Sequence, residues 1–364
     1  MLKVSGWIYT LEGFVEGTVH FEEGHVEEVS RRREKNPLAE GLILPCFFNA
    51  HTHVGDAIVL EEPLGSLEEI VGPPHGLKFR RLNEAREEEL VGAMRRMLDR
   101  MVLSGTSAFC DFREGGVGGA NALLQALQGS SADALLLGRP ASLRYDREEV
   151  EALLEVAAGI GVSSISDWDY GELTKLAQHV KRAGKVFSLH ASEAHQEDLD
   201  LVLDLKPDFL VHMTVASQAD WQRCAQEEVP VAICPRSQVF FGRVPDIPGM
   251  LAAGLNLLLG TDNAMFANPS MLREIEFAYQ VGRLKGGISP DAVLRMAYGG
   301  AKLLCGSHSI TFQEGESSTF LVLKVPMGGD QCYQAIRAME TDILLLSIGP
   351  RLWLRDRGWQ KTRG

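Results

Sequence analysis

Eight short apolar runs constrain the fold of this chain more than any other feature of its sequence. They occupy the middle of the chain, and longer amphipathic segments separate them. In order, the runs read LILPCFF, TSAFCDF, DALLLGR, VSSIS, KVFSLH, DFLVHM, VPVAIC and LNLLLG. Such runs are typical of buried parallel strands, and strands that alternate with helices form parallel sheets. The repeat predicts an α/β protein with a (β/α)8 TIM barrel.

The clearest helical pattern lies between the first two runs, in NEAREEELVGAMRRMLDRMVLSG. Leu90, Met94, Met97 and Met101 recur there at spacings of four, three and four residues. This spacing places the four side chains on one face of a helix, and Gly105 is typical of a helix end. We interpret the methionines as core packing and not as a cofactor site.

Both ends of the chain are rich in β-type runs instead. Near the N-terminus, Gly13, Gly17 and Gly24 separate short runs, which is typical of antiparallel hairpins. After Cys305, the runs STFLVLKVP and DILLLSIGPRLWL follow. We expect the two ends to form one small β structure beside the barrel. The predicted division is residues 1–45 and 306–364 for this β structure and residues 46–305 for the barrel.

Charge and cysteine content narrow the class of protein. The formal net charge is −13 at pH 7, and nucleic-acid binders are usually basic. No apolar segment approaches the roughly 20 residues of a membrane span, and the N-terminus lacks the apolar stretch of a secretion signal. The six cysteines form no C-x-x-C pair. We therefore expect a cytoplasmic protein that binds neither nucleic acid nor membranes.

Five candidate site residues directly follow or close the apolar runs. His51 and His53 follow the first run, His190 and His212 lie in the fifth and sixth, and Asp262 follows the eighth. In TIM barrels, functional residues gather at the carboxyl ends of the strands. Residues two apart on a strand point the same way, so the paired histidines can share one ion. Each residue also has a purely structural alternative, as a satisfied core histidine or a helix N-cap.

Five stretches of the chain together resemble the amidohydrolase superfamily. In order they are LPCFFNAHTHVGD, HASEAHQ, LVHMTVAS, CPRSQ and GTDNAMFANPSM, between about residues 44 and 306. The resemblance is to the branch of cytosine, guanine and S-adenosylhomocysteine/adenosine deaminases and triazine hydrolases. It implies a distorted TIM barrel with a composite β-sandwich from both termini. It also implies that His51, His53, His190 and Asp262 bind a metal and that His212 contacts the water on it.

Imidazoles and one carboxylate are suitable ligands for one divalent metal per chain. We expect Zn²⁺, with Fe²⁺ and Mn²⁺ as alternatives. Such an ion can lower the pKa of a bound water to about 7, which provides hydroxide at neutral pH. Relatives with two metals use a carboxylated lysine after the fourth strand, and GVSSISDWDY has no lysine. Asp167 or Asp169 would be the alternative ligand of a second metal.

The expected reaction is hydrolytic deamination of an amino-substituted heterocycle: a purine, pyrimidine, pterin or nucleoside-like molecule. The predicted catalytic residues are Glu193, His212 and Asp262. Glu193 lies three residues after His190 and would carry protons, since deamination needs a carboxyl group near the metal but not bound to it. Its structural alternative is an acid at a helix N-terminus. Other functions left open are hydrolysis of a cyclic or linear amide C–N bond and a non-catalytic metal- or ligand-binding barrel.

Three residues are predicted to contact the small-molecule substrate: Arg139, which ends the third run, and Arg236 and Ser237 in CPRSQ. A surface salt bridge is the alternative for Arg139. Gln238 replaces the asparagine common in the family, so hydrogen bonding to the heterocycle is expected to differ.

The loop after the first run carries three basic residues, Lys78, Arg80 and Arg81. They could meet an anionic group, but a solvated basic turn is the interpretation that we favour. Whether the chain forms a homo-oligomer stays open.

Overall fold

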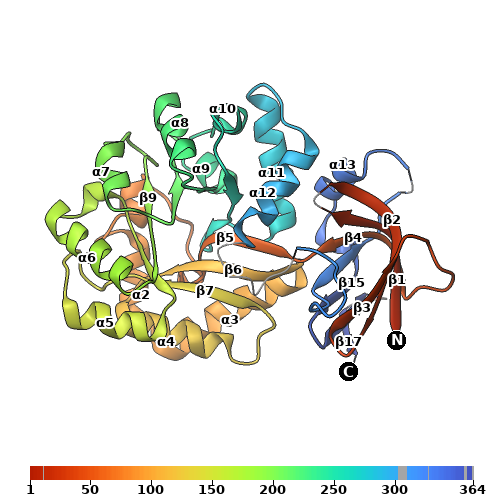
Figure 1. Cartoon of the computed structure of the whole chain (residues 1–364). Coiled ribbons are helices and arrows are strands. Elements are labelled where there is room, and N and C mark those ends of the chain that lie inside the picture. The colour runs from red at the N-terminus through yellow and green to blue at the C-terminus, as the bar shows by residue number, and fades with distance from the viewer. Residues whose placement is uncertain (11, 302–309, 327, 356–358, 363–364) are drawn as a thin grey trace.

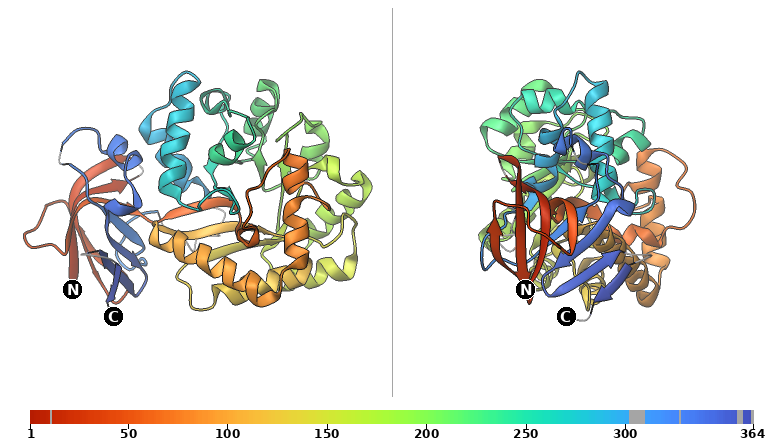
Figure 2. Two further views of the ribbon diagram at one scale, coloured as in Figure 1. Left: turned by 180° about the vertical axis from the view of Figure 1, so that it is seen from behind. Right: turned by 90° about the vertical axis from the view of Figure 1, so that its right-hand side faces the viewer.

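The computed structural model describes residues 1–10, 12–301, 310–326, 328–355 and 359–362. A barrel and a separate β domain lie side by side, and both chain termini lie in the β domain (Figure 1). The two bodies also lie side by side when the molecule is seen from behind (Figure 2, left). The predicted α/β barrel with a β domain built from both chain ends is thereby confirmed. None of the described helices is long and apolar enough to cross a membrane.

The barrel is a curled parallel sheet. Its strands, in spatial order from the first, are β5 (Phe47–His53), β6 (Thr106–Arg113), β7 (Asp133–Gly138), β8 (Gly159–Val162), β9 (Val186–Ala191), β10 (Phe209–His212), β11 (Val231–Ile233) and β12 (Leu257–Leu259). The chain then continues into β13 (Asp262–Asn263), which pairs with β5. Because β12 pairs with β11 and β13 pairs with β5, these two short strands together close the barrel.

Helices follow the barrel strands along the chain. They are α1 (Leu67–Val71), α2 (Leu77–Glu84), α3 (Glu87–Leu103), α4 (Gly116–Leu127), α5 (Arg147–Val156), α6 (Tyr170–Arg182), α7 (Leu199–Asp204), α8 (Gln218–Gln226), α9 (Pro235–Phe240), α10 (Ile247–Ala252), α11 (Met271–Leu284) and α12 (Pro290–Gly299). In α3, the predicted methionines Met94, Met97 and Met101 are buried in the core. The helix begins four residues later than the sequence pattern, because α2 ends just before it.

Two of the apolar runs differ from the strands observed. The first run contributes to two sheets, since β4 (Ala39–Pro45) belongs to the β domain and β5 to the barrel. Both strands are buried, so their boundary leaves no polar signal. The fourth strand is β8, which ends where the run VSSIS begins, and residues Ile165–Asp167 form a 3-10 turn. Gly159 and Gly161 lack the branched side chains typical of a strand, and a Cβ at Gly159 would overlap the backbone of Val186.

The β domain is one eight-stranded sheet built from both chain ends. In spatial order it comprises β17 (Trp359–Thr362), β16 (Arg351–Arg355), β15 (Ile343–Ile348), β14 (Phe320–Leu323), β4, β1 (Leu2–Thr10), β2 (Gly13–Glu22) and β3 (His25–Ser30), and a short helix α13 (Gln331–Ile336) follows β14 in the chain. In Figure 1 the red N-terminal and blue C-terminal strands lie together. Gly17 lies inside β2 and does not end it. The predicted barrel end at residue 305 lies outside the described residues.

An aromatic stack joins the β domain to the barrel. The ring of Tyr298 on α12 stacks on Tyr9 of β1 and on Phe47 of β5, with centroid distances of 5.2 and 5.6 Å. Its hydroxyl donates a hydrogen bond of 3.1 Å to the carbonyl oxygen of Pro45, at the passage from β4 to β5. All three rings are buried. The two bodies therefore share part of one core.

Candidate metal centre

Strands β5, β9, β10 and β13 bring the five strand-end residues of the sequence analysis together at one end of the barrel. His51 and His53 lie on β5, where pairing with β6 shifts register between Asn49 and Thr52. Such irregularities often re-aim side chains near functional sites. The ring of Phe112 on β6 packs edge-on against His51 and His190, at centroid distances of 4.6 and 5.2 Å. The imidazoles are therefore held by an apolar wall.

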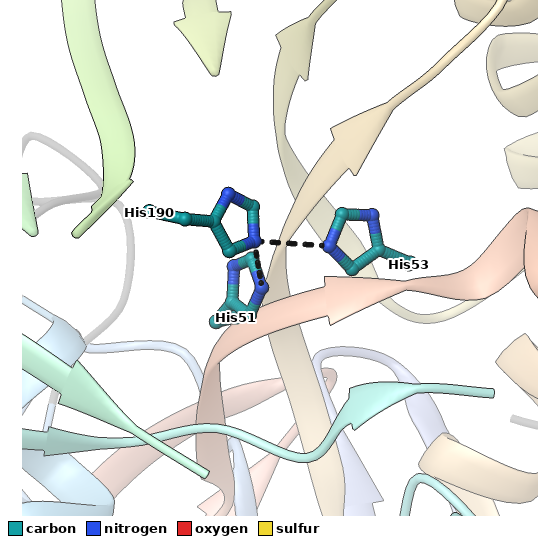
Figure 3. Close-up of side chains that lie close together, drawn as sticks. All are labelled: His51, His53 and His190. Carbon is teal, nitrogen blue, oxygen red and sulfur yellow. Dashed lines mark hydrogen bonds between the residues drawn. The ribbon is translucent and has the colours of Figure 1, made fainter. Parts of the chain in front are cut away.

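Donor atoms of His51, His53, His190 and Asp262 lie close to one another. The Nε2 atom of His190 lies 3.2 Å from Nε2 of His51 and 3.3 Å from Nε2 of His53 (Figure 3). The Oδ1 atom of Asp262 lies 3.4 Å from Nε2 of His51 and 3.7 Å from Nε2 of His53. Tetrahedral ligands about 2.0–2.1 Å from a zinc ion are about 3.3–3.4 Å apart. The spacing therefore fits a single metal ion.

The hydrogen bonds of His190 and His53 leave the Nε2 lone pairs of these two imidazoles facing the donor cluster. Nδ1 of His190 donates to the carbonyl oxygen of Val162 at 2.8 Å, and Nδ1 of His53 donates to that of Phe112 at 3.1 Å. Burial, with the charge of Lys78, lowers the pKa of His53 to about 3. Burial also lowers the pKa of His51 and holds that of His190 well below its usual value. Neutral imidazoles with converging lone pairs are suitable metal ligands.

Asp262 and His212 have unusual backbones. Asp262 has a φ of 58° and His212 a φ of 76°, both in the left-handed region that few residues other than glycine adopt. The Ser237 hydroxyl donates a hydrogen bond of 2.5 Å to Oδ2 of Asp262. Burial alone would raise the pKa of Asp262, but contact with His51 and the charge of His212 hold it well below its usual range. Asp262 is therefore an anion in this site.

Glu193 lies beside the donor cluster without belonging to it. Its Oε1 atom is 3.4 Å from Nε2 of His212 and accepts a hydrogen bond of 2.9 Å from Gln238. His212 can itself form a second donor group with His51 and Asp262. Burial and the nearby Asp262 carboxylate raise the pKa of Glu193 to about 7. A carboxyl group with such a pKa can both give and take a proton near neutrality.

A cavity of about 600 Å³ opens onto this cluster. His53, His190, His212, Glu193 and Asp262 all line it. Its other walls come from the loops after several strands, and include Glu68 and Pro73 after β5, Arg139 after β7, Ser163 and Asp167 after β8, Glu197 after β9, and Arg243 after α9. The volume is within the range of small-molecule sites, about 300–1,000 Å³.

A buried charge network adjoins His53, and the sequence analysis did not foresee it. Lys78 on α2 is only 2% exposed, and its ammonium lies 2.9 Å from Oδ2 of Asp56 and 2.7 Å from Oε1 of Glu114. The same oxygen of Glu114 lies 2.8 Å from Nδ1 of His53. Arg113 pairs with the other oxygen of Glu114 at 2.6 Å. The favoured interpretation of Lys78 as part of a solvated basic turn is therefore wrong, whereas Arg80 is exposed.

The remaining predicted site residues lie in different places. Arg139 is 5% exposed, lines the cavity and lies over the Phe79 ring at 5.4 Å, so it is not a surface residue. Arg236 is not among the cavity-lining residues, and its guanidinium pairs with Glu274 at 2.5 Å. Ser237 is fully buried against Asp262.

The two candidate ligands of a second metal, Asp167 and Asp169, also lie in different places. Asp167 lines the cavity, whereas Asp169 is the N-cap of α6, where it accepts a hydrogen bond of 3.1 Å from the backbone of Glu172. The two potential metal-binding groups found among the described residues draw on His51, His53, His190, His212 and Asp262 only.

Comparison with known proteins gives a family match and related sequences. The model of the amidohydrolase family matches residues 42–310 of this chain. A proposed aminohydrolase of Archaeoglobus fulgidus is 37% identical over 295 residues, which cover 80% of this chain and 82% of that protein. An uncharacterized protein of Methanocaldococcus jannaschii is 32% identical over 333 residues, which cover 85% of this chain and 86% of that protein.

Solved structures share the fold at low sequence identity. An adenosine deaminase from Xanthomonas campestris with bound zinc has a TM-score of 0.81 at 16% identity, covering 100% of this chain and 94% of that one. A guanine deaminase from C. acetobutylicum with guanine in its active site has a TM-score of 0.77 at 15% identity, covering 96% of this chain and 99% of that one. At these identities the likeness concerns the fold.

Proposed function

The chain belongs to the amidohydrolase family, and on that premise we propose that it is a metal-dependent aminohydrolase. The reaction is hydrolytic release of ammonia from an amino-substituted heterocycle: a purine, pyrimidine, pterin or nucleoside-like molecule. His51, His53, His190 and Asp262 would hold one divalent metal per chain, with Zn²⁺ as the expected ion. Their donor separations of 3.2 to 3.7 Å support this assignment. We retain the expectation of a cytoplasmic enzyme.

The placement of Glu193 is the observation that carries the proposal. Its carboxylate lines the cavity, 3.4 Å from His212, and it is not one of the four converging donors. Deamination of a heterocycle requires proton transfer to a ring nitrogen and to the leaving amine. A carboxyl group that is near the metal ligands but not bound by the metal can serve both transfers. An ordinary amide hydrolase needs no donor directed at a ring nitrogen.

Asp262 and His212 would serve the other steps of the reaction, which are the removal of a proton from water and the orientation of the attacking oxygen. Bound at this point, a divalent metal would supply hydroxide at neutral pH. Asp262 would take the first proton released from water, and His212 would orient the attacking oxygen. That oxygen adds to the ring carbon that bears the amine, while Glu193 protonates the ring nitrogen. Glu193 would then take the hydroxyl proton of the adduct and pass it to the amine, so that the C–N bond breaks, ammonia leaves and a carbonyl remains on the ring. The proton held by Asp262 would return Glu193 to its protonated form.

The cavity supports a substrate larger than a bare pyrimidine, since its volume of about 600 Å³ exceeds that of one ring. Arg139 would be a substrate contact, because it lines the cavity and its Nη2 atom is buried without a hydrogen-bond partner. The proposal no longer includes Arg236, whose guanidinium is held by Glu274.

Replacement of Glu193 tests the proposal. Glu193→Gln keeps the shape of the side chain but removes its proton, so kcat for ammonia release should fall by about 10²–10⁴-fold while the metal stays bound. Ammonia release and metal content of the purified variant are the measurements. Glu68→Gln, at an exposed carboxylate on the same cavity, is the control and should retain kcat. Unchanged ammonia release by Glu193→Gln would reject the assignment.

A substrate screen identifies the heterocycle. The metal-loaded chain should release ammonia from at least one purine, pyrimidine, pterin or nucleoside. Ammonia from none of these, together with carboxylate formation from cyclic or linear amides, would replace the proposal by amide hydrolysis. Tight metal binding without turnover of either class would instead indicate a binding barrel.

A further inference from the structure

Gln238, which replaces the asparagine common in the family, contacts two of the proposed catalytic residues. It lies on α9, is fully buried and is not among the residues that line the cavity. Its Nε2 atom lies 2.9 Å from Oε1 of Glu193 and 3.1 Å from Nδ1 of His212. The side chain therefore faces the catalytic groups, and the expectation that this position alters hydrogen bonding to the heterocycle needs revision.

The chemistry of these contacts decides which way the amide points. The structure places the NH2 group of Gln238 toward Glu193, and this fits the ionised form of Glu193, because a carboxylate offers only acceptors. That group has two hydrogens, one for Glu193 and one for Nδ1 of His212. With the amide reversed, its carbonyl oxygen would face the carboxylate at 2.9 Å without a hydrogen between them. Nδ1 of His212 is therefore an acceptor, and a neutral His212 carries its hydrogen on Nε2.

We propose that Gln238 is a positioning residue that fixes His212 as the Nε2–H tautomer and holds the Glu193 carboxylate beside it. The inference rests on the proposed function for the roles of His212 and Glu193, but the tautomer itself does not depend on turnover. Nε2 of His212 lies 3.4 Å from Oε1 of Glu193 and 4.0 Å from Oδ2 of Asp262. A protonated Nε2 has no lone pair for a metal. The structure thus favours His51, His53, His190 and Asp262 as ligands, with His212 as a hydrogen-bond donor.

Local structure explains how one short helix reaches both sides of the site. Pro235 occupies the first turn of α9, and the backbone N–H of Gln238 donates to the carbonyl oxygen of Cys234 at 3.0 Å. Ser237, the preceding residue, donates to Asp262. Two neighbouring residues of α9 therefore contact different parts of the site. Ser237 contacts the proposed metal ligand Asp262, and Gln238 contacts the proposed proton-transfer residues Glu193 and His212. An asparagine at position 238 is one methylene shorter and would lose reach toward Glu193 or His212.

The tautomer can be read by NMR of the zinc-loaded full chain with ¹⁵N-labelled histidine. The His212 signal is identified by its loss in His212→Asn. In the wild type we expect hydrogen on Nε2 only. Gln238→Leu removes the donor and should give a mixture of tautomers. Gln238→Glu supplies an acceptor and should move the hydrogen to Nδ1. Gln196→Leu is the control, since Gln196 lines the cavity but donates to Asp220, and it should leave the signal unchanged.

Kinetics provides the second readout on the substrate found in the screen. Gln238→Leu and Gln238→Asn should lower kcat at least about 10-fold with a smaller change in KM, because the residue aligns proton-transfer groups and does not contact substrate. A wild-type His212 with hydrogen on Nδ1, a metal-bound Nε2 signal, or an unchanged tautomer in both Gln238→Leu and Gln238→Glu would overturn the inference. If no heterocycle is deaminated, the NMR result still decides it.

Discussion

Lys78 is a buried ammonium that depends on carboxylates from two other parts of the chain. It enters from α2 and meets Asp56 after β5 and Glu114 after β6. Asp56 in turn accepts a hydrogen bond of 2.7 Å from Asn263, the residue after Asp262. A buried charge is tolerated when its partners neutralise it. The network therefore fixes the surroundings of His53 on one side and of Asp262 on the other.

Removing this ammonium should be costly. Lys78→Met removes the ammonium from Oδ2 of Asp56 and Oε1 of Glu114, while Arg113 still pairs with the other oxygen of Glu114. Breaking a buried pair typically lowers the free energy of unfolding by about 3–5 kcal/mol. Urea unfolding of the metal-free protein measures the change. Arg81→Met is the matched control, because Arg81 also pairs with two carboxylates, Glu61 and Glu84, but is partly exposed. It should cost less than about 1 kcal/mol. Equal losses in the two variants would contradict the prediction.

The histidine cluster makes the stability of the metal-free protein depend on pH. Burial lowers the pKa of His51, His53 and His190 below the value in an unfolded chain, about 6.5. Above about pH 6.5 these histidines are neutral in both the folded and the unfolded state, so their protonation does not lower the stability of the fold. As the pH falls below about 6.5, the unfolded state binds protons that the folded state does not, and each histidine then lowers stability by up to about 1.4 kcal/mol per pH unit.

Unfolding in urea at pH 7 and at pH 5.5 measures this effect. His190→Gln removes one buried imidazole, so its loss of stability over this interval should be smaller than that of the wild type. Carboxyl groups titrate equally in both proteins and cancel in the comparison. His25→Gln, at an exposed site outside the barrel, should behave like the wild type. If His190→Gln lost as much stability between pH 7 and pH 5.5 as the wild type, the prediction would be contradicted.

At the residue scale, sequence reasoning found the strand-end groups and missed their supports. His51, His53 and Asp262 follow apolar runs and His190 closes one, and in a barrel such positions predict site residues. Lys78, Asp56 and Glu114 carry no such signal, because their pairing depends on how α2 folds back onto β5 and β6. Gln238 was noticed only as a departure from the family pattern. Its contacts with Glu193 and His212 depend on how α9 packs in the folded chain.

At the scale of elements, β8 shows how a strand can lack the usual composition. It reads G-I-G-V, and its two glycines allow close approach of neighbouring groups. A Cβ at Gly161 would lie 2.7 Å from the Phe112 ring, which itself packs on His51 and His190. The absence of a side chain at this position therefore lets Phe112 support the histidine cluster. A pattern that relies on branched apolar residues therefore predicts the fourth strand at VSSIS, which begins only at the last residue of β8.

Filling that space should disturb the metal site as well as the fold. Gly161→Val should lower the free energy of unfolding by about 1–3 kcal/mol, as overpacking of a core does, and should weaken zinc binding through displacement of Phe112. Competition with a chromophoric chelator measures the affinity. Gly118→Ala on α4 is the control, because a Cβ there meets nothing within 4 Å. It should raise stability by about 0.5–1 kcal/mol and leave zinc affinity unchanged.

At the scale of the whole molecule, the stack of Tyr9, Tyr298 and Phe47 makes the β domain and the barrel interdependent. The β domain also needs both chain ends, because β14 pairs with β4 and β15 while β4 pairs with β1. The strand types at both ends and the barrel repeat predicted this architecture. The joint itself was not predictable, since Tyr298 lies on a helix that the sequence pattern links only to the barrel.

Substitution of Tyr298 tests the joint. Tyr298→Ala removes the central ring and should lower the free energy of unfolding by about 3–5 kcal/mol. Tyr298→Phe keeps the stack and loses only the hydrogen bond to Pro45, which should cost about 1 kcal/mol. Urea unfolding followed by both fluorescence and circular dichroism measures both variants. Equal losses in the two would show that stacking contributes little.

The positive φ angles of His212 and Asp262 lower the stability of the folded protein, whereas the side chains at these two positions are needed for the proposed catalysis. A residue held in a sparsely populated backbone region raises the energy of the folded state by about 1–3 kcal/mol. Glycine or asparagine relieves that tension but cannot perform the chemistry proposed for either side chain. Directed evolution for thermal tolerance alone would therefore tend to discard both residues, so such a campaign should couple every round to turnover.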